Sequence, residues 1–354
     1  MSHRSQQHRP VHPFADGTRS TRRGLLLGAA GTAAALGLAA CGGDDGASSA
    51  SSGGAKGAAG AFPVTVKHAL GSTTIKAAPQ RVVTYGYTDQ DPVLALGTIP
   101  VGTLRWIPQW KRGVGAWAER ALGDAQPKIY SGDQIDFEGI AAARPDLILI
   151  VTYALPKKDY DKLLQIAPTV PTVGGYPDWG VPWQAATEQI GRALGKPAQA
   201  RKLVADAEAR FAKAQADHPK FAGREVLITA PGSGGQLSVF APTDTRGRFV
   251  TSLGFTQPKA IEKATGDQFY AYLSPERLDL VDVDALIVLA DDPTTRKDLL
   301  EQPAFNRLSV VKEGRAIMVD DLDLSMALSA SSVLSIPYAL DRIVPQLDAA
   351  LAKA

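Results

Sequence analysis

Two stretches of this sequence repeat one another at distant places in the chain. FEGIAAARPDLILI, residues 137–150, aligns with PERLDLVDVDALIV, residues 275–288. The alignment matches Glu138 with Glu276 and Asp146 with Asp284, and each stretch ends in an apolar run. A chain that places the same acidic residues at the head of the same elements twice is expected to contain two halves built on one plan.

The two halves share an alternation of short strands and helices. The pattern of the first half predicts strands at residues 81–85, 99–102 and 146–152 and helices at 88–96 and 138–143. Residues 170–173 are predicted to form an edge strand, because a proline within them cannot donate a hydrogen bond to a neighbouring strand. The second half predicts strands at residues 225–229, 284–289 and 315–319, and helices at 245–253, 276–281 and 332–351. Such alternation is typical of mainly parallel sheets covered by helices. The fold class is therefore α/β, with two α/β lobes.

A long helical segment separates the halves. Its apolar positions run from Trp183 to Phe211, and Gly195 to Pro197 are expected to kink or break it. The domain boundaries that follow are an N-terminal lobe at 62–180, an inter-lobe helix at 181–221 and a C-terminal lobe at 222–354.

The first 61 residues do not look like part of a fold. Residues 1–40 contain a twin-arginine-like pair, Arg22 and Arg23, followed by a small apolar run, which indicates a signal peptide. Leu38 to Cys41 resembles a lipobox, in which Cys41 would be lipidated. The alternative is a membrane anchor with a chance cysteine, but the apolar run is short for a span. Residues 41–61 are rich in Gly, Ala and Ser and indicate a flexible tether.

Composition limits the classes of partner and of covalent structure. The chain has 354 residues and one cysteine, so it can form no disulfide within itself. Its formal net charge is +2, and much of the excess of basic residues lies in the signal peptide. The remaining chain is nearly neutral, which argues against nucleic acid as a partner.

The order and spacing of these elements resemble a known family of binding proteins. The stretches RVVTYGYTDQDPVLALGTIPVG, FEGIAAARPDLILI and SPERLDLVDVDALIVL, with the long middle helix, resemble the substrate-binding lipoproteins of ABC importers for ferric siderophores, vitamin B12 and haem. These are periplasmic binding proteins of the class III, helical-backbone type. The resemblance implies that the ligand binds in a cleft between the lobes and that the joining helix permits only a small hinge motion.

Two different roles are considered for the paired glutamates, Glu138 and Glu276. Asp136 and Ser274 can cap the short helices, so Glu138 and Glu276 would lie in first turns and compensate the helix dipole, a contribution of about 0.3–1 kcal/mol. The resemblance implies instead that an exposed glutamate at the tip of each lobe docks onto arginines of the permease dimer.

Candidate ligand-binding residues follow from strand topology, because ligands of open α/β sheets bind beyond the carboxyl ends of the strands. Aromatic side chains with a few arginines suit a bulky, partly apolar ligand that presents oxygen acceptors. The candidates in the expected mouth loops and adjoining elements are Tyr85, Tyr87, Arg105, Trp106, Trp110, Tyr153, Trp179, Trp183, Arg246, Arg248, Tyr270 and Tyr272.

Three other functions are weighed against a ferric siderophore of hydroxamate type. A bare-metal site is disfavoured because His68 and His218 are the only histidines after the signal peptide and neither lies in a mouth loop, so no metal ligands and no cofactor are expected. A secreted hydrolase is disfavoured because residues 232–235 lack the G-x-S-x-G pattern. Haem or cobalamin stays open as the ligand, since tyrosine can ligate haem iron. We therefore expect a monomeric, non-enzymatic protein, lipid-anchored at the extracytoplasmic face of the cell membrane, with iron bound through its chelator.

Overall fold

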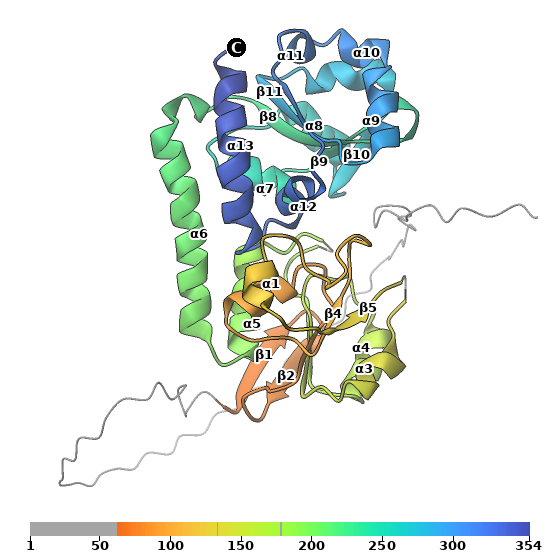
Figure 1. Cartoon of the computed structure of the whole chain (residues 1–354), viewed down its shortest axis with the longest axis vertical. Coiled ribbons are helices and arrows are strands. Elements are labelled where there is room, and N and C mark those ends of the chain that lie inside the picture. Colours follow the sequence, from red (N-terminus) through yellow and green to blue (C-terminus); the bar gives the residue numbers. More distant parts are fainter. Residues whose placement is uncertain (1–61, 133, 178) are drawn as a thin grey trace, which may run out of the picture. The chain divides into compact units, whose positions relative to one another are not determined.

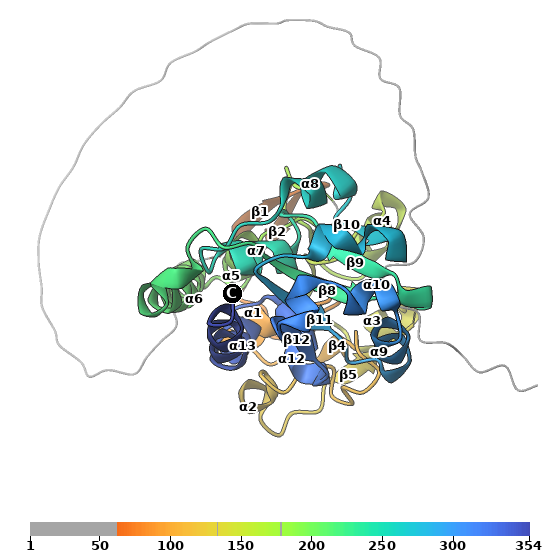
Figure 2. The ribbon, with the colours of Figure 1, turned by 90° about the horizontal axis from the view of Figure 1, so that it is seen from above.

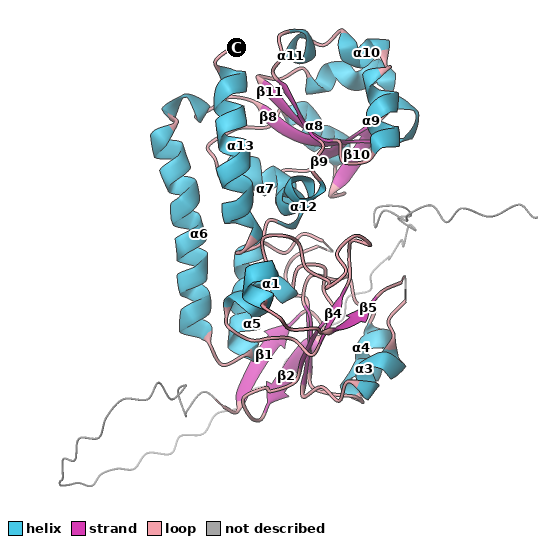
Figure 3. Cartoon of the chain, in the orientation of Figure 1, coloured by secondary structure: helices cyan, strands magenta, loops and turns pink. Residues whose placement is uncertain are grey.

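The computed structural model describes residues 62–132, 134–177 and 179–354. Two five-stranded sheets form the cores of two lobes, and a separate two-stranded hairpin belongs to the first (Figures 1 and 3). The signal peptide, Cys41 and the tether expected from the sequence lie outside the described residues. Within the described ranges, no helix is both long enough and apolar enough to cross a membrane.

The sheet of the first lobe is parallel throughout, with strand order β5-β4-β3-β6-β7. All four residues of β6 are fully buried, as expected for a parallel sheet covered on both faces. Strand β7 lies at the edge and ends at Pro171, which confirms the edge strand predicted from that proline. The strands of this lobe are β1 Val64–His68, β2 Gly71–Ile75, β3 Val82–Thr84, β4 Gly102–Leu104, β5 Lys128–Tyr130, β6 Leu147–Ile150 and β7 Thr169–Pro171. Its helices are α1 Gln90–Ala95, α2 Glu119–Leu122, α3 Phe137–Ala142, α4 Lys157–Leu164 and α5 Trp183–Ala193.

The sheet of the second lobe is mixed, with strand order β10-β9-β8-β11-β12. Strands β8, β11 and β12 are parallel, whereas β9 runs antiparallel to β8 and β10. The sheet contains parallel strands as predicted, and β9 runs antiparallel to its neighbours because the connection after β8 is too short for a parallel crossover. The strands are β8 Val226–Pro231, β9 Leu237–Phe240, β10 Tyr270–Leu273, β11 Ala285–Leu289 and β12 Ala316–Val319.

Helices cover both faces of this second sheet (Figures 1 and 2). The short helix predicted at 276–281 is present as a 3-10 helix, η3. The helices are α7 Thr245–Thr251, α8 Lys259–Thr265, η3 Pro275–Val281, α9 Pro293–Leu300, α10 Pro303–Asn306, α11 Ser309–Lys312, α12 Leu322–Ala330 and α13 Ser335–Leu351.

The segment expected to be one inter-lobe helix over residues 181–221 contains two α-helices. Helix α5 ends at Ala193, and α6 spans Pro197–Asp217. Gly195 lies between them with φ +69°, a left-handed conformation that commonly ends a helix, and Pro197 takes a favoured first position. Ile190 of α5 is buried in the first lobe, whereas α6 packs beside α13 of the second (Figure 2). The connection between the lobes therefore runs through α6.

The paired aspartates of the repeat pin the heads of neighbouring strands. The carboxylate of Asp146, ahead of β6, accepts the backbone N–H groups of Gln80 at 2.8 Å and Arg81 at 2.9 Å, just ahead of β3. The carboxylate of Asp284, ahead of β11, accepts the backbone N–H of Glu225 at 2.8 Å, just ahead of β8. In each lobe one aspartate thus joins the starts of two adjacent parallel strands.

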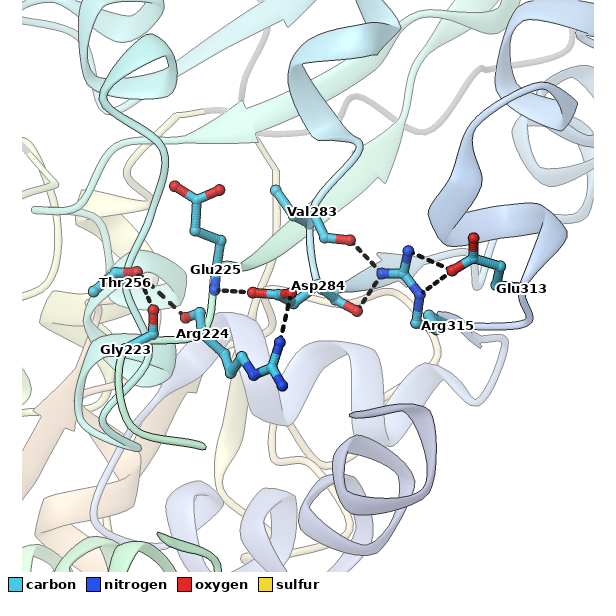
Figure 4. A network of polar contacts seen from close by, with 8 residues as sticks. All are labelled: Gly223, Arg224, Glu225, Thr256, Val283, Asp284, Glu313 and Arg315. Atoms are coloured by element: carbon cyan, nitrogen blue, oxygen red, sulfur yellow. Dashed lines mark hydrogen bonds and ion pairs between the residues drawn. The ribbon is translucent and has the colours of Figure 1, made fainter. Parts of the chain in front are cut away.

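Guanidinium groups complete each of these junctions. In the second lobe, Arg315 donates to the carbonyl oxygens of Val283 at 2.6 Å and Asp284 at 2.5 Å, and Arg224 donates to the Asp284 carboxylate at 3.1 Å (Figure 4). In the first lobe, Arg81 donates to two carbonyl oxygens of the turn that precedes β6. The repeat in the sequence therefore corresponds to a repeated polar junction.

Buried hydrogen bonds also join the two lobes directly. Asp91 of α1 is fully buried and accepts the indole N–H of Trp117 at 2.7 Å and the hydroxyl of Ser332, which precedes α13. Trp110 donates its indole N–H to Asp323 of α12 at 3.1 Å. The lobes are thus linked by side chains on α1 and on the loop after β4, in addition to α6.

The protonation of Asp91 links this junction to pH. Burial raises the pKa of Asp91 to about 6, while hydrogen bonds from Ser332, Trp117 and Gln90 act in the opposite direction. No charged side chain contributes to this shift, so the junction is held by neutral donors only. The native state therefore retains a proton that the unfolded chain, with an ordinary pKa of about 3.9, has already lost.

We expect the contribution of Asp91 to the unfolding free energy to fall as pH rises from about 4 to about 6, because over that interval this side chain keeps its proton in the native state and has lost it in the unfolded state. The Asp91 part of this change is on the order of 3 kcal/mol. Asp91→Asn should remove it, as measured by urea unfolding of both proteins at pH 4.5, 5.5 and 7. Equal pH dependence in the two proteins would contradict this assignment.

Candidate functional site

Loops after four parallel strands of the first lobe bring aromatic rings together. Tyr87 follows β3, Trp106 follows β4, Tyr153 follows β6 and Trp179 follows β7. The Tyr87 ring centroid lies 5.6 Å from that of Trp106, 5.5 Å from that of Tyr153 and 5.2 Å from that of Trp179. These separations are typical of stacked and edge-on aromatic pairs. We call these four residues, all only partly buried, the aromatic cluster.

Trp179 adopts an unusual backbone conformation within the cluster. Its φ is +65°, in the left-handed region that bulky residues rarely occupy. Such strain persists only where the surroundings enforce it, and it is frequent at ligand sites. Here the Trp179 ring packs against Tyr87 and, at 6.2 Å, against Tyr153.

Two buried donors at the candidate site have no hydrogen-bond partner among the described residues. They are the indole Nε1 of Trp106 and the Nη1 of Arg248 on α7. A buried unpaired donor costs about 1–3 kcal/mol, so both atoms are suited to an acceptor supplied by a ligand. The Arg105 side chain, which follows β4, likewise makes no hydrogen bond or ion pair with a described residue.

Arg248 belongs to the second lobe but lies near a loop of the first. Burial lowers the pKa of the Arg248 guanidinium, while electrostatic interactions with Asp244 and Tyr176 act in the opposite direction. Tyr176 lies in the loop after β7, close in sequence to Trp179. The Arg248 guanidinium is therefore within electrostatic range of a loop of the first lobe.

Arg246, the neighbouring candidate, is engaged within the second lobe. It is 4% exposed and forms a two-point ion pair with Asp244, with bonds of 2.7 Å and 2.9 Å. Its guanidinium also lies 3.6 Å from the centre of the Phe240 ring. Breaking such a buried pair would leave an uncompensated charge, so Arg246 supports the lobe as an ion-paired core residue.

Three other candidates also lie in the protein interior. Tyr85 is 1% exposed, and its hydroxyl bonds with the backbone of Gln134 and Asp136. Trp110 is buried and serves the inter-lobe bond to Asp323. Trp183 was expected in a mouth loop; it is instead the first residue of α5 and packs in a buried cluster with residues of the second lobe.

The candidate tyrosines of the second lobe lie on a strand. Tyr270 and Tyr272 belong to β10, at the edge of the mixed sheet, and the expectation that they occupy a loop is wrong. Their rings contact each other edge to face at 5.2 Å, and Tyr272 is 52% exposed. An exposed aromatic on an edge strand can still contact a ligand.

The glutamates of the repeat are both exposed near the start of their short helices. Asp136 caps α3 by accepting the backbone N–H of Gly139 at 2.8 Å, as predicted. Ser274 does not cap η3 in this way; a hydrogen bond from its side chain instead lowers the pKa of Glu276. Neither glutamate belongs to the aromatic cluster.

Sequence reasoning missed two residues at this site. Asp89 was given no role at the ligand site; it lies at the start of α1, makes no side-chain capping bond and contacts the loop after β6. Trp117 was not assigned a role, yet its ring stacks edge-on with Trp110 at 5.2 Å and lies 5.9 Å from Tyr338. Val151 and Thr152, which bond to Asp89, and Tyr338, which contacts Trp117, are remote in sequence, so no local pattern could have identified these contacts. Among the described residues, no group of three or more His, Cys, Asp or Glu could hold a metal ion.

Comparison with known proteins adds a family match and several relatives. Residues 82–321 match the model of a family described as periplasmic binding protein. The probable siderophore-binding lipoprotein YfiY of Bacillus subtilis is 28% identical over 295 residues, covering 79% of this chain and 86% of that protein.

Two solved structures are similar along almost their whole length. A periplasmic solute-binding protein from Mycobacterium smegmatis has a TM-score of 0.74 and 33% identity, covering 81% of this chain and 98% of that chain. PiaA from Streptococcus pneumoniae, solved in complex with ferrichrome, has a TM-score of 0.69 and 28% identity, covering 82% and 99% respectively.

Proposed function

Because the chain belongs to the periplasmic binding protein family, whose members are non-enzymatic solute-binding proteins, we propose that it captures a ferric siderophore and delivers it to an ABC permease. Relatives and structural neighbours named as siderophore-binding proteins support this proposal. The observation that carries it is the aromatic cluster, in which the buried indole N–H of Trp106 has no hydrogen-bond partner among the described residues. Aromatic walls with a few donors suit a bulky chelate that presents oxygen acceptors.

The uncharged aromatic walls support a ferric siderophore of hydroxamate type, whereas Arg105 and Arg248 would also accept a chelate that carries negative charge. The aromatic cluster carries no ionised group at neutral pH, and Asp244 neutralises Arg246. Trp106 and Arg248 can each donate to a chelate oxygen. Iron would be carried inside its chelator as cargo, so the protein needs no metal ligands or cofactor of its own. Haem and cobalamin are the alternative ligands.

The ligand site would contain residues of both lobes. Tyr87, Trp106, Tyr153 and Trp179 would form one wall, with Arg105 beside them, and Arg248, Tyr270 and Tyr272 would contact the ligand from the second lobe. We assign Tyr85, Trp110, Trp183 and Arg246 a supporting role, because each is buried and engaged within the protein.

The protein would act as a monomer at the extracytoplasmic face of the cell membrane. Signal-peptide residues 1–40 and the lipobox ending at Cys41 support export and lipid anchoring, and the tether at 41–61 would let the lobes reach the permease. Glu138 and Glu276, exposed on equivalent elements of two lobes, would each meet a basic patch of a permease dimer.

Purified protein should bind iron-loaded ferrichrome or staphyloferrin B with sub-micromolar affinity and lose tryptophan emission, because Trp106 and Trp179 lie in the aromatic cluster. The melting temperature should rise with ligand concentration, since ligand binds only the native state.

Trp106→Phe keeps an aromatic ring but removes the indole N–H, and should weaken binding roughly tenfold. A titration panel that adds haem and cobalamin tests the alternatives. Tighter binding of haem or cobalamin than of every ferric siderophore would overturn the proposed ligand class.

The double variant Glu138→Ala, Glu276→Ala should fold and bind ligand as the wild type does, because both side chains are exposed. Siderophore-dependent uptake by cells that carry only this variant should fall sharply, and each single variant should fall less. The control is Glu208→Ala, Glu262→Ala, which removes the same charge from other exposed positions. Docking through exposed charges should also weaken with salt. If the double variant supports full uptake, the docking role is contradicted, and the glutamates serve only to compensate the helix dipoles.

Cys41→Ser should shift the protein from the membrane fraction to the soluble extracytoplasmic fraction, because the thiol is the only site for a thioether-linked lipid. Fractionation of cells with immunodetection measures this. Unchanged membrane retention would rule out the lipid anchor.

A further inference from the structure

The buried carboxylate of Asp89 makes four hydrogen bonds between two loops of the candidate site. Its Oδ2 accepts the backbone N–H of Gly86 at 3.1 Å and of Val151 at 2.7 Å. Its Oδ1 accepts the backbone N–H of Thr152 at 3.0 Å and the Thr152 hydroxyl at 2.8 Å. A carboxylate offers about four acceptor positions, so the side chain is saturated. Asp89 is also fully buried.

Each of these bonds lies beside a residue of the aromatic cluster. Gly86 immediately precedes Tyr87, and Thr152 immediately precedes Tyr153. The backbone N–H of Thr88 donates to the Thr152 hydroxyl at 3.0 Å, and that of Tyr87 donates to the Thr152 carbonyl at 3.4 Å. The loops after β3 and β6 are thereby tied together on both sides of Tyr87. Its ring then lies 5.5 Å from that of Tyr153.

The packing leaves no space for variation at this contact. A Cβ at residue 86 would lie 2.3 Å from Oδ2 of Asp89, so only glycine permits the carboxylate to reach the backbone. A fully buried carboxylate held by neutral donors alone is costly, because burial disfavours its charged form. Three of the four donors are backbone N–H groups of two loops, and these bonds therefore fix loop geometry as well as compensating the charge.

We propose that Asp89 is a positioning residue of the ligand site, which holds Tyr87 and Tyr153 in the arrangement that receives the ligand. This inference rests on the proposed function for the meaning of the site. The residue does not contact the ligand itself. It acts by pre-organising the aromatic cluster, so that binding need not order these loops.

A matched control exists within the same pair of strands. Asp146 joins the heads of β3 and β6, whereas Asp89 joins the loops at their opposite ends. Both residues bond to backbone N–H groups of the first lobe, but only Asp89 bonds beside the aromatic cluster. A loss of lobe stability alone would affect both variants, whereas a loss of site geometry would affect only one.

The test compares Asp89→Asn with Asp146→Asn in the full-length protein. An asparagine retains one acceptor oxygen and turns an NH₂ group toward backbone donors, so at least one bond and the local geometry are lost. Titrations with iron-loaded ferrichrome and staphyloferrin B, at a temperature where both variants are folded, should show at least a tenfold loss of affinity for Asp89→Asn. Asp146→Asn should bind within twofold of the wild type, although it melts at a lower temperature.

A ligand-free readout keeps this test separate from the proposed function. The near-ultraviolet circular dichroism of the aromatic side chains should change in Asp89→Asn and not in Asp146→Asn. If the wild type binds neither chelate, the proposed ligand class fails, and an unchanged dichroism spectrum would still overturn the positioning role. If the wild type binds and Asp89→Asn binds equally well, the positioning role is overturned while the function stands.

Two milder variants cover the case in which Asp89→Asn does not fold. Thr152→Val removes one bond to the carboxylate and one acceptor for Thr88, and should weaken binding about threefold. Gly86→Ala should displace the carboxylate and weaken binding further. Combined with Asp89→Asn, where that variant folds, it should add little, because the two changes disrupt one contact. Wild-type affinity and dichroism in both milder variants would contradict the proposal.

Discussion

The starts of the central strands in each lobe are fixed by a carboxylate. Asp146 accepts two backbone N–H groups ahead of β3 and, through its own N–H, donates to the Arg81 carbonyl at 3.0 Å. Asp284 makes the equivalent exchange with Glu225 ahead of β8. These bonds are exposed to solvent, so each contributes less than a buried bond to a charged group, but together they align the starts of adjacent strands. Register at the heads of the strands determines where their other ends, and hence the site loops, emerge.

Part of this architecture could be predicted because it depends on local pattern. The repeat around Glu138 and Glu276 marked equivalent elements of two lobes, and both glutamates are exposed. The edge position of β7 followed from Pro171, and the break between α5 and α6 from Gly195 and Pro197. The twelve candidates chosen by the rule that ligands bind beyond the ends of parallel strands include the four residues that form the aromatic cluster.

The remaining features depend on partners that no local pattern reveals. Arg246 and Arg248 look alike in sequence. In the structure, Arg246 donates two hydrogen bonds to the carboxylate of Asp244, and Arg248 does not. Tyr270 lies in a strand because β10 pairs with β9. Strand β9 is available there because the short connection after β8 makes it run antiparallel beside β8. Asp89 resembles an ordinary helix cap until the loop after β6 supplies its donors. In each case tertiary contacts override the local signal.

The contact between Asp89 and Gly86 has a consequence for how proteins with this lobe can diverge. Positions 87, 106, 153 and 179 present partly buried rings, so exchanging them would alter the shape of the cluster. Position 86 has no such freedom, since any side chain there meets the carboxylate of residue 89. Across lineages that have changed their cargo, positions 86 and 89 should therefore be retained or replaced together while the neighbouring aromatics drift.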